Sequence, residues 1–114
     1  MLRQILIELI RNGFKFNQSE LKRVEVGCRP AIFENGFEIC VQDNGIGIAP
    51  RYHAQIFRIF QRLHTASEYK GTGIGLAIVK RAVQKMGGTL RLESDAGMGC
   101  RFCIHLPETM VHGL

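Results

Sequence analysis

Two pairs of short alternating segments constrain the fold of this chain most strongly. In the first pair, residues 24–28 and 37–41 alternate apolar with polar or small side chains, and the Asn-Gly dipeptide at 35–36 is a strong signal for a tight turn. In the second pair, residues 90–92 and 102–106 alternate in the same way around the sequence SDAGMG. Each pair therefore predicts a β-hairpin.

Helical periodicity occupies the segments around these hairpins. Apolar residues recur every three to four positions from Leu2 to Phe16 and again from Ile74 to Met86, where a Gly-Gly pair follows the second run. Residues 52–63 show a shorter helical pattern. The predicted order is helix, two strands, helix, helix, two strands. This order favours an α+β fold, in which about three helices cover one face of a mixed, mostly antiparallel sheet.

Length and charge limit the class of protein. A chain of 114 residues has room for one core, so we expect a single domain over residues 1–114. No apolar run reaches the length of a membrane span, and the polar residues near the start are not typical of a signal peptide. We therefore expect a cytoplasmic protein without direct membrane insertion. The net charge of +5 is scattered, with no basic run, which argues against a nucleic-acid partner.

Cys100 and Cys103 have a C-x-x-C spacing, but no second pair completes a zinc set. Their neighbours alternate as in a strand, so we expect the two side chains on opposite faces of a sheet. Buried structural thiols are the favoured interpretation, ahead of metal binding or redox chemistry.

The sequence DNGIGI, residues 43–48, is a candidate site for recognising a base. Taken alone, an Asp followed by Asn-Gly after a strand is more often a simple turn. In the functional interpretation, Asp43 accepts a hydrogen bond from an exocyclic amine, and Gly45 and Gly47 let a flat ring lie against the backbone. Adenine has such an amine, whereas guanine has a carbonyl oxygen there. A charge-assisted hydrogen bond is worth roughly 1.5–3 kcal/mol, enough to discriminate between bases.

The sequence GTGIGLAIVK, residues 71–80, places three glycines at the start of the last predicted helix. It lacks the preceding strand of a dinucleotide-binding fold, the Lys-Ser/Thr of a P-loop and the companion motifs of a protein kinase. Its position nevertheless suits an anion, because the N–H groups and the dipole of a helix N-terminus favour negative charge. A phosphate-binding loop and a flexible hinge are equally supported by this motif alone.

Glu8, Asn12 and Lys15 line one stripe of the first predicted helix. A solvated surface is the ordinary interpretation of such a stripe. The functional alternative is a metal and phosphate site, in which Asn12 offers an oxygen to Mg²⁺ and Lys15 meets a phosphate as a point charge.

Together, these motifs resemble the ATP-binding catalytic domain of sensor histidine kinases, in the GHKL superfamily shared with DNA gyrase and the ninety-kilodalton heat-shock chaperones. ELIRNGFKF is similar to the N box of that domain, DNGIGI and GTGIGLAIVK to its two glycine boxes, and IFRIFQRLH to its F box. The resemblance extends from about Leu2 to Pro107, and FQRLH, EYKGTGIGLA and KFN indicate the phytochrome-like branch. It implies a two-layer α/β sandwich of the Bergerat type.

The resemblance also implies roles for individual residues. Lys15 and Arg62 would contact the phosphates during catalysis, and Mg²⁺ is expected at Asn12 with help from Glu8. Phe57 and its neighbour Phe60 would anchor a lid that closes over the triphosphate. The residues implied to bind the nucleotide are Asn12, Lys15, Asp43, Gly45, Gly47, Gly71, Thr72, Gly73, Gly75 and Leu76.

The implied reaction is transfer of the γ-phosphate of ATP–Mg²⁺ to a histidine on a separate dimerisation and phosphoacceptor domain, with a response-regulator receiver domain as the downstream partner. None of the four histidines here has the setting of such an acceptor. We therefore expect a fragment that lacks the upstream domain. The resemblance also implies a strand before the first helix, which is missing here, so we expect the sheet to lack this strand and to expose an apolar edge.

Two alternatives remain open. Glu8 stands where many of these kinases carry Asn, and a Glu at this point is the general base in gyrase-type relatives. The chain could therefore be an ATP-hydrolysing switch with Glu8 as base. The other alternative is a degenerate module that binds only a nucleotide or a protein partner.

Overall fold

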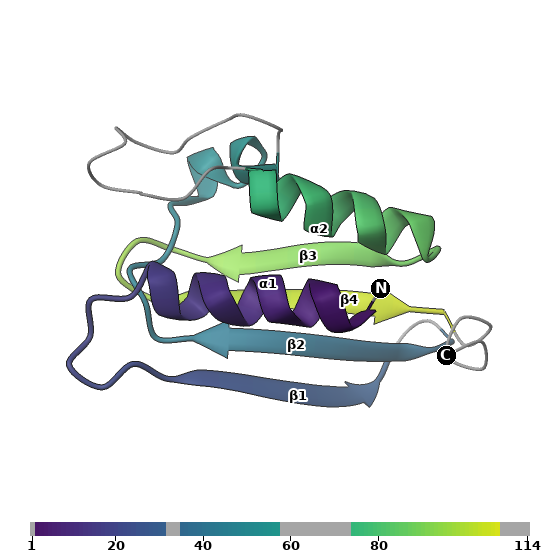
Figure 1. The fold of residues 1–114 in the computed structure, drawn as a ribbon, viewed down its shortest axis with the longest axis horizontal. Coiled ribbons are helices and arrows are strands. Elements are labelled where there is room, and N and C mark those ends of the chain that lie inside the picture. The colour runs from purple at the N-terminus through teal and green to yellow at the C-terminus, as the bar shows by residue number, and fades with distance from the viewer. Residues whose placement is uncertain (1, 32–34, 58–73, 108–114) are drawn as a thin grey trace.

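The computed structural model describes residues 2–31, 35–57 and 74–107, which form two layers (Figure 1). One layer is a four-stranded sheet, and the other contains helices α1 (Leu2–Lys15) and α2 (Ile74–Lys85), both on the same face of the sheet. The predicted α+β class, with helices on a single face, is confirmed. Neither α1 nor α2 has the length and apolar character needed to cross a bilayer.

The sheet contains β1 (Val24–Pro30), β2 (Phe37–Asp43), β3 (Thr89–Ser94) and β4 (Cys100–Leu106) in the order β1-β2-β4-β3. Both predicted hairpins are present, and the pairing of β2 with β4 joins them. All three pairings among the described strands are antiparallel, so this part of the sheet is not mixed. β1 forms one edge.

The hydrophobic core lies between the sheet and the two helices. Periods of 3.6 residues in the helices and two in the strands place the apolar side chains on the facing sides of the two layers. Each large buried side chain contributes about 1.5–3 kcal/mol relative to an exposed one. The core residues are Ile5, Leu9, Val41, Ile56, Val79, Val83, Met86, Phe102, Ile104 and Leu106.

The prediction of a helix over 52–63 is wrong for the part of this segment that the structure describes. Two single 3₁₀ turns replace it, η1 (Pro50–Tyr52) and η2 (Gln55–Phe57). The apolar pattern is still used, because the ring of Phe57 packs edge-on against Phe102 with 6.2 Å between centroids. Residues beyond η2, up to the start of α2, lie outside the described residues.

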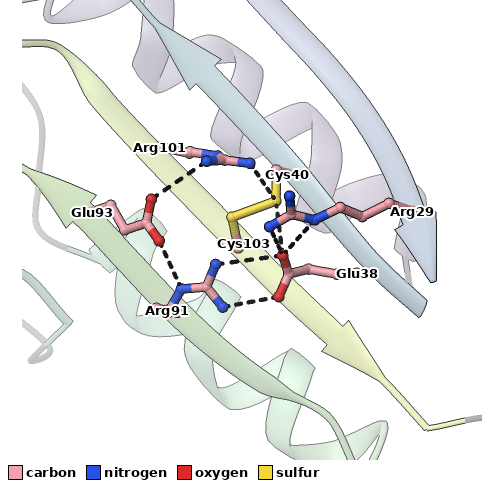
Figure 2. The surroundings of a disulfide bond; sticks show 7 residues. All are labelled: Arg29, Glu38, Cys40, Arg91, Glu93, Arg101 and Cys103. Atoms are coloured by element: carbon pink, nitrogen blue, oxygen red, sulfur yellow. Dashed lines mark hydrogen bonds and ion pairs between the residues drawn. A yellow bond between two sulfur atoms is a disulfide. The ribbon is translucent and has the colours of Figure 1, made fainter. Parts of the chain in front are cut away.

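The interpretation of Cys100 and Cys103 as two buried thiols is wrong for Cys103. Cys103 lies directly opposite Cys40 in the β2–β4 ladder and forms a disulfide with it (Figure 2). Cys100 keeps a partly buried free thiol that packs against the core. The two side chains therefore lie on opposite faces of β4, as predicted.

We expect opening of the Cys40–Cys103 disulfide to lower the free energy of unfolding by roughly 4 kcal/mol, because the bond restricts the unfolded chain over a 63-residue separation. Urea denaturation with and without a reductant measures the change. Cys28→Ser, at an exposed free thiol, should keep the full effect. The double variant Cys40→Ser/Cys103→Ser should lose it. If the reductant does not change the urea concentration at which the original chain is half unfolded, the prediction is contradicted.

Candidate functional site

Asp43 is the last residue of β2 and lies beside the end of α1. Its Oδ1 accepts hydrogen bonds from the backbone N–H groups of Gly45 at 2.8 Å and Cys100 at 3.1 Å. Burial raises the pKa of Asp43, and these two N–H groups act in the opposite direction. Among the described residues no donor is bonded to Oδ2, so this oxygen can accept a hydrogen bond from a ligand.

Two glycines allow the backbone to approach this carboxylate closely. A methyl group on Gly13 of α1 would lie 2.8 Å from Val24 Cγ2 and 3.2 Å from Asp43 Cβ. A methyl group on Gly45 would lie 2.5 Å from the carbonyl oxygen of Phe16 and 2.9 Å from Asp43 Oδ1. The sequence predicted a role for Gly45 in the pocket. It did not predict that Gly13 brings the helix against the same carboxylate.

The loop after β2 is held from two sides by backbone hydrogen bonds. The N–H of Ile46 donates to the carbonyl of Phe16 at the end of α1, with a distance of 3.1 Å. From the other side, the N–H of Gly97 donates to the carbonyl of Ile46 at 2.7 Å, and the N–H of Ile48 donates to Ser94 Oγ at 2.8 Å. The loop therefore has a defined position between α1 and the β3–β4 turn.

Two asparagines also hold the loop after β2 in place, a contact that the sequence did not predict. Asn17 is only 4% exposed and donates from Nδ2 to Asn44 Oδ1 at 2.7 Å. Asn44 Oδ1 also accepts the N–H of Arg23 at 2.8 Å, and Asn44 Nδ2 donates to the carbonyl of Leu21 at 2.9 Å. These bonds fasten the connection between α1 and β1 to the loop after β2. Asn44 stood inside the DNGIGI motif, but nothing in its spacing indicated a partner 27 positions away.

Glu8, Asn12 and Lys15 all lie on α1, as predicted. The Nδ2 atom of Asn12 is buried and has no hydrogen-bond partner within the described part of the chain. Glu8 is 37% exposed and lies 4.0 Å from Arg11, while Lys15 is exposed with its Nζ 5.7 Å from the Phe16 ring centre. Buried polar atoms are nearly always hydrogen-bonded, so the Nδ2 atom of Asn12 marks this turn of α1 as a candidate ligand contact. The nitrogen and oxygen of an amide exchange places when the group rotates, so Asn12 offers either a hydrogen-bond donor or an oxygen ligand at this position.

The structure thus brings the last turn of α1 together with Asp43 and its loop. Gly47 belongs to that loop, where its positive φ allows a close approach to the backbone of Asp95. Of the second glycine motif, Gly75 and Leu76 lie in the first turn of α2, and Leu76 packs against the core. The predicted residues outside the described part of the chain are Phe60, Arg62, Gly71, Thr72 and Gly73.

Gly47 and Gly97 offer a matched test of how closely the loop and the β3–β4 turn must approach. Their φ angles are 73° and 81°, so alanine at either position is expected to cost about 1–2 kcal/mol from backbone conformation alone. A methyl group on Gly47 would also collide with the carbonyl oxygen of Asp95, whereas one on Gly97 would meet open space. Urea denaturation should show a larger loss of stability for Gly47→Ala than for Gly97→Ala. Equal losses would contradict the close approach.

Comparison with protein families gives a match over residues 1–110 to the model described as histidine kinase-, DNA gyrase B- and HSP90-like ATPase. The phytochrome-like protein Cph1 of Synechocystis sp. is 45% identical over 107 residues, which are 93% of this chain and 14% of that protein. The circadian input-output histidine kinase CikA of Synechococcus elongatus is 42% identical over 113 residues, covering 94% of this chain and 14% of the relative. The chain therefore spans only a small part of these relatives.

Solved structures agree with this match. The mycobacterial sensor histidine kinase MprB has a TM-score of 0.76 and 30% identity, covering 91% of this chain and 68% of that one. Full-length ShkA in complex with AMPPNP has a TM-score of 0.74 and 34% identity, covering 93% of this chain and 21% of that one.

Proposed function

Because this chain belongs to the family of histidine kinase-, DNA gyrase B- and HSP90-like ATPases, we propose that it is the ATP-binding catalytic domain of a phytochrome-like sensor histidine kinase. The observation that carries the proposal is the meeting of two motifs that are far apart in the sequence. These are the Asp43 carboxylate with the glycine-containing loop that follows it, and the end of α1 with the buried Nδ2 atom of Asn12.

Asp43 is suited to recognise adenine. Two backbone N–H groups hold Oδ1, so the carboxylate is oriented before a ligand arrives. Oδ2 then accepts a hydrogen bond from the exocyclic amine of adenine, and Gly45 and Gly47 let the loop beside it pack closely against the backbone of Phe16 and Asp95. Partial burial strengthens this hydrogen bond, because competing water is excluded.

In this proposal, α1 and the second glycine motif bind the phosphates and the metal. When bound, Mg²⁺ neutralises charge on the phosphates during transfer. Asn12 would hold it through the amide oxygen, and Glu8, one turn earlier on α1, would assist through a water. Lys15 would meet a phosphate as a point charge. Arg62, with Gly71, Thr72 and Gly73, completes the proposed triphosphate site.

The proposed phosphate acceptor is a histidine on a separate dimerisation and phosphoacceptor domain, and a response-regulator receiver domain acts downstream. Two histidines in the described part of the chain each place a ring nitrogen within hydrogen-bond distance of a backbone carbonyl. His53 Nε2 lies 2.9 Å from the carbonyl oxygen of Ile48, and His105 Nε2 lies 3.2 Å from that of Asn35. Neither is an obvious acceptor. The proposed location is the cytoplasm.

Asp43→Asn is expected to weaken the binding of ATP–Mg²⁺ by about tenfold or more, since a hydrogen bond to a charged group worth roughly 1.5–3 kcal/mol is lost. Calorimetric titration of both proteins measures the change. Glu25→Gln neutralises an exposed carboxylate on β1 and serves as the control, with unchanged affinity. Equal affinity of Asp43→Asn and the original chain would refute the adenine assignment.

Incubated with γ-labelled ATP, the chain is expected to bind nucleotide without labelling itself, because the acceptor histidine belongs to another domain. Electrophoresis under neutral conditions, which preserves phosphohistidine, measures incorporation. Strong acid-labile labelling of the chain would contradict this prediction. It would not contradict the proposed binding of ATP.

The ATP-hydrolysing alternative rests on Glu8, which is partly exposed on α1 one turn before Asn12. Steady release of phosphate that disappears in Glu8→Gln would favour this alternative over phosphoryl transfer. The absence of ATP binding in the presence of Mg²⁺ would favour a degenerate module.

A further inference from the structure

The face of the sheet opposite α1 and α2 carries a charged group of side chains around the only disulfide of the described residues (Figure 2). Ile39 and Val41 of β2 point toward the helices, so the alternate residues Glu38 and Cys40 point to the other face. We call the group on that face the disulfide cluster. Its members are Arg29, Glu38, Cys40, Arg91, Glu93, Arg101 and Cys103.

Ion pairs arrange the cluster around a central carboxylate. Glu38 Oε2 lies 2.8 Å from Arg91 Nη1, and Glu38 Oε1 lies 2.7 Å from Arg29 Nη2. Hydrogen bonds from Arg91 and then Arg29 lower the pKa of Glu38 to about 2, so it is ionised at neutral pH. Glu93 links Arg91 to Arg101 at 3.1 and 3.5 Å. Within the disulfide cluster, three guanidinium groups and two carboxylates surround the sulfur atoms, so the cluster itself is positive. Glu25 of β1 is on the same face one row farther along the ladder, opposite Gln42 and not opposite Cys40.

Long, partly exposed side chains cover the two buried cysteines on this face. Cys40 is 7% exposed and Cys103 is 1% exposed. On this face, however, their neighbours are the long side chains of the cluster, and those of Arg29 and Arg91 are each 48% exposed. Rotation of these side chains can uncover the disulfide while the β2–β4 ladder stays paired. One guanidinium atom, Arg101 Nη2, lies 3.8 Å from Cys40 Sγ.

We propose that Cys40 and Cys103 are a thiol–disulfide exchange site for small anionic thiols of the glutathione class. A thiolate RS⁻ attacks one sulfur, the Cys40–Cys103 bond breaks, and a mixed disulfide forms while the other cysteine leaves as a thiolate. A second RS⁻ then attacks the sulfur of the R group in the mixed disulfide, which releases RSSR and the second cysteine thiolate. In sum, two RSH are oxidised to RSSR and the protein disulfide is reduced to two thiols, and RSSR drives the reverse reaction.

The positive charge of the cluster favours this class of reactant. Arginines attract the carboxylates of an incoming anionic thiol, and Arg101 stabilises a thiolate that leaves at Cys40, an effect that the nearby Glu38 opposes. Glu38, Cys40 and Cys103 also offer three donor atoms within 4.8 Å for a metal ion. Both oxygens of Glu38 are already bound by arginines, and three guanidinium groups repel a cation, so the anionic thiol is the better fit.

The test uses the oxidised Cys28→Ser chain, which removes the exposed free thiol. It is treated without denaturant with glutathione or with cationic cysteamine at equal thiolate concentrations. Samples are quenched by alkylation, and mass spectrometry counts modified Cys40 and Cys103. Glutathione is expected to reduce the disulfide severalfold faster than cysteamine, and added salt should diminish this ratio.

Arg91→Gln and Arg101→Gln, each made in the same background, should lower the glutathione-to-cysteamine ratio. Arg81→Gln, on an exposed position of α2, should leave the ratio unchanged. Urea denaturation of each oxidised variant establishes that it is folded during the assay. A ratio that the cluster variants do not alter would overturn the proposal. Reduction that occurs only at urea concentrations that unfold the chain would also overturn it.

Discussion

The pairing of β2 with β4 is the interaction on which the rest of this structure depends. It joins two local hairpins into one sheet, and it places Val41 opposite Phe102 and Ile39 opposite Ile104 beneath the helices. The same pairing brings Cys40 to Cys103 on the other face. Beyond the last pair of the ladder, it lets the N–H of Cys100 reach the carboxylate of Asp43. Core, disulfide and candidate site are therefore consequences of one register.

The candidate site owes its shape to backbone groups more than to charged side chains. Backbone N–H groups orient Asp43, and backbone carbonyls of Phe16 and Ile46 hold the loop that follows it. Such contacts require residues that leave the backbone accessible, which explains the glycines beside the carboxylate. A site built this way is preorganised, so little conformational freedom has to be lost when a ligand binds.

The two faces of the sheet differ in the interactions that stabilise them. The face beneath α1 and α2 is apolar and carries most of the hydrophobic stabilisation. On the opposite face, charged residues at alternate positions form ion pairs across strands, from Arg29 on β1 through Glu38 on β2 to Arg91 on β3. Glu38 reaches Arg91 across the intervening strand β4, so its ion pairs connect both hairpins.

The sequence by itself determined the elements with strong periodicity. These are the two hairpins, α1 and α2, and from them the class of fold, because each depends on residues close together in the chain. The grouping of Asp43, Gly45 and Gly47 could also be predicted, since all three stand in one motif. The structure of residues 52–57 could not be predicted, because their short apolar pattern fits a helix and a pair of 3₁₀ turns equally well.

Only the tertiary structure decided the contacts between distant segments. Cys40 meets Cys103 across 63 positions, Asn17 meets Asn44 across 27, and Gly13 meets Asp43 from another element. The physical reason is that these contacts depend on the register of β2 against β4 and on the depth at which α1 packs. Both are set by the combined packing of many side chains, which no local pattern in the sequence records.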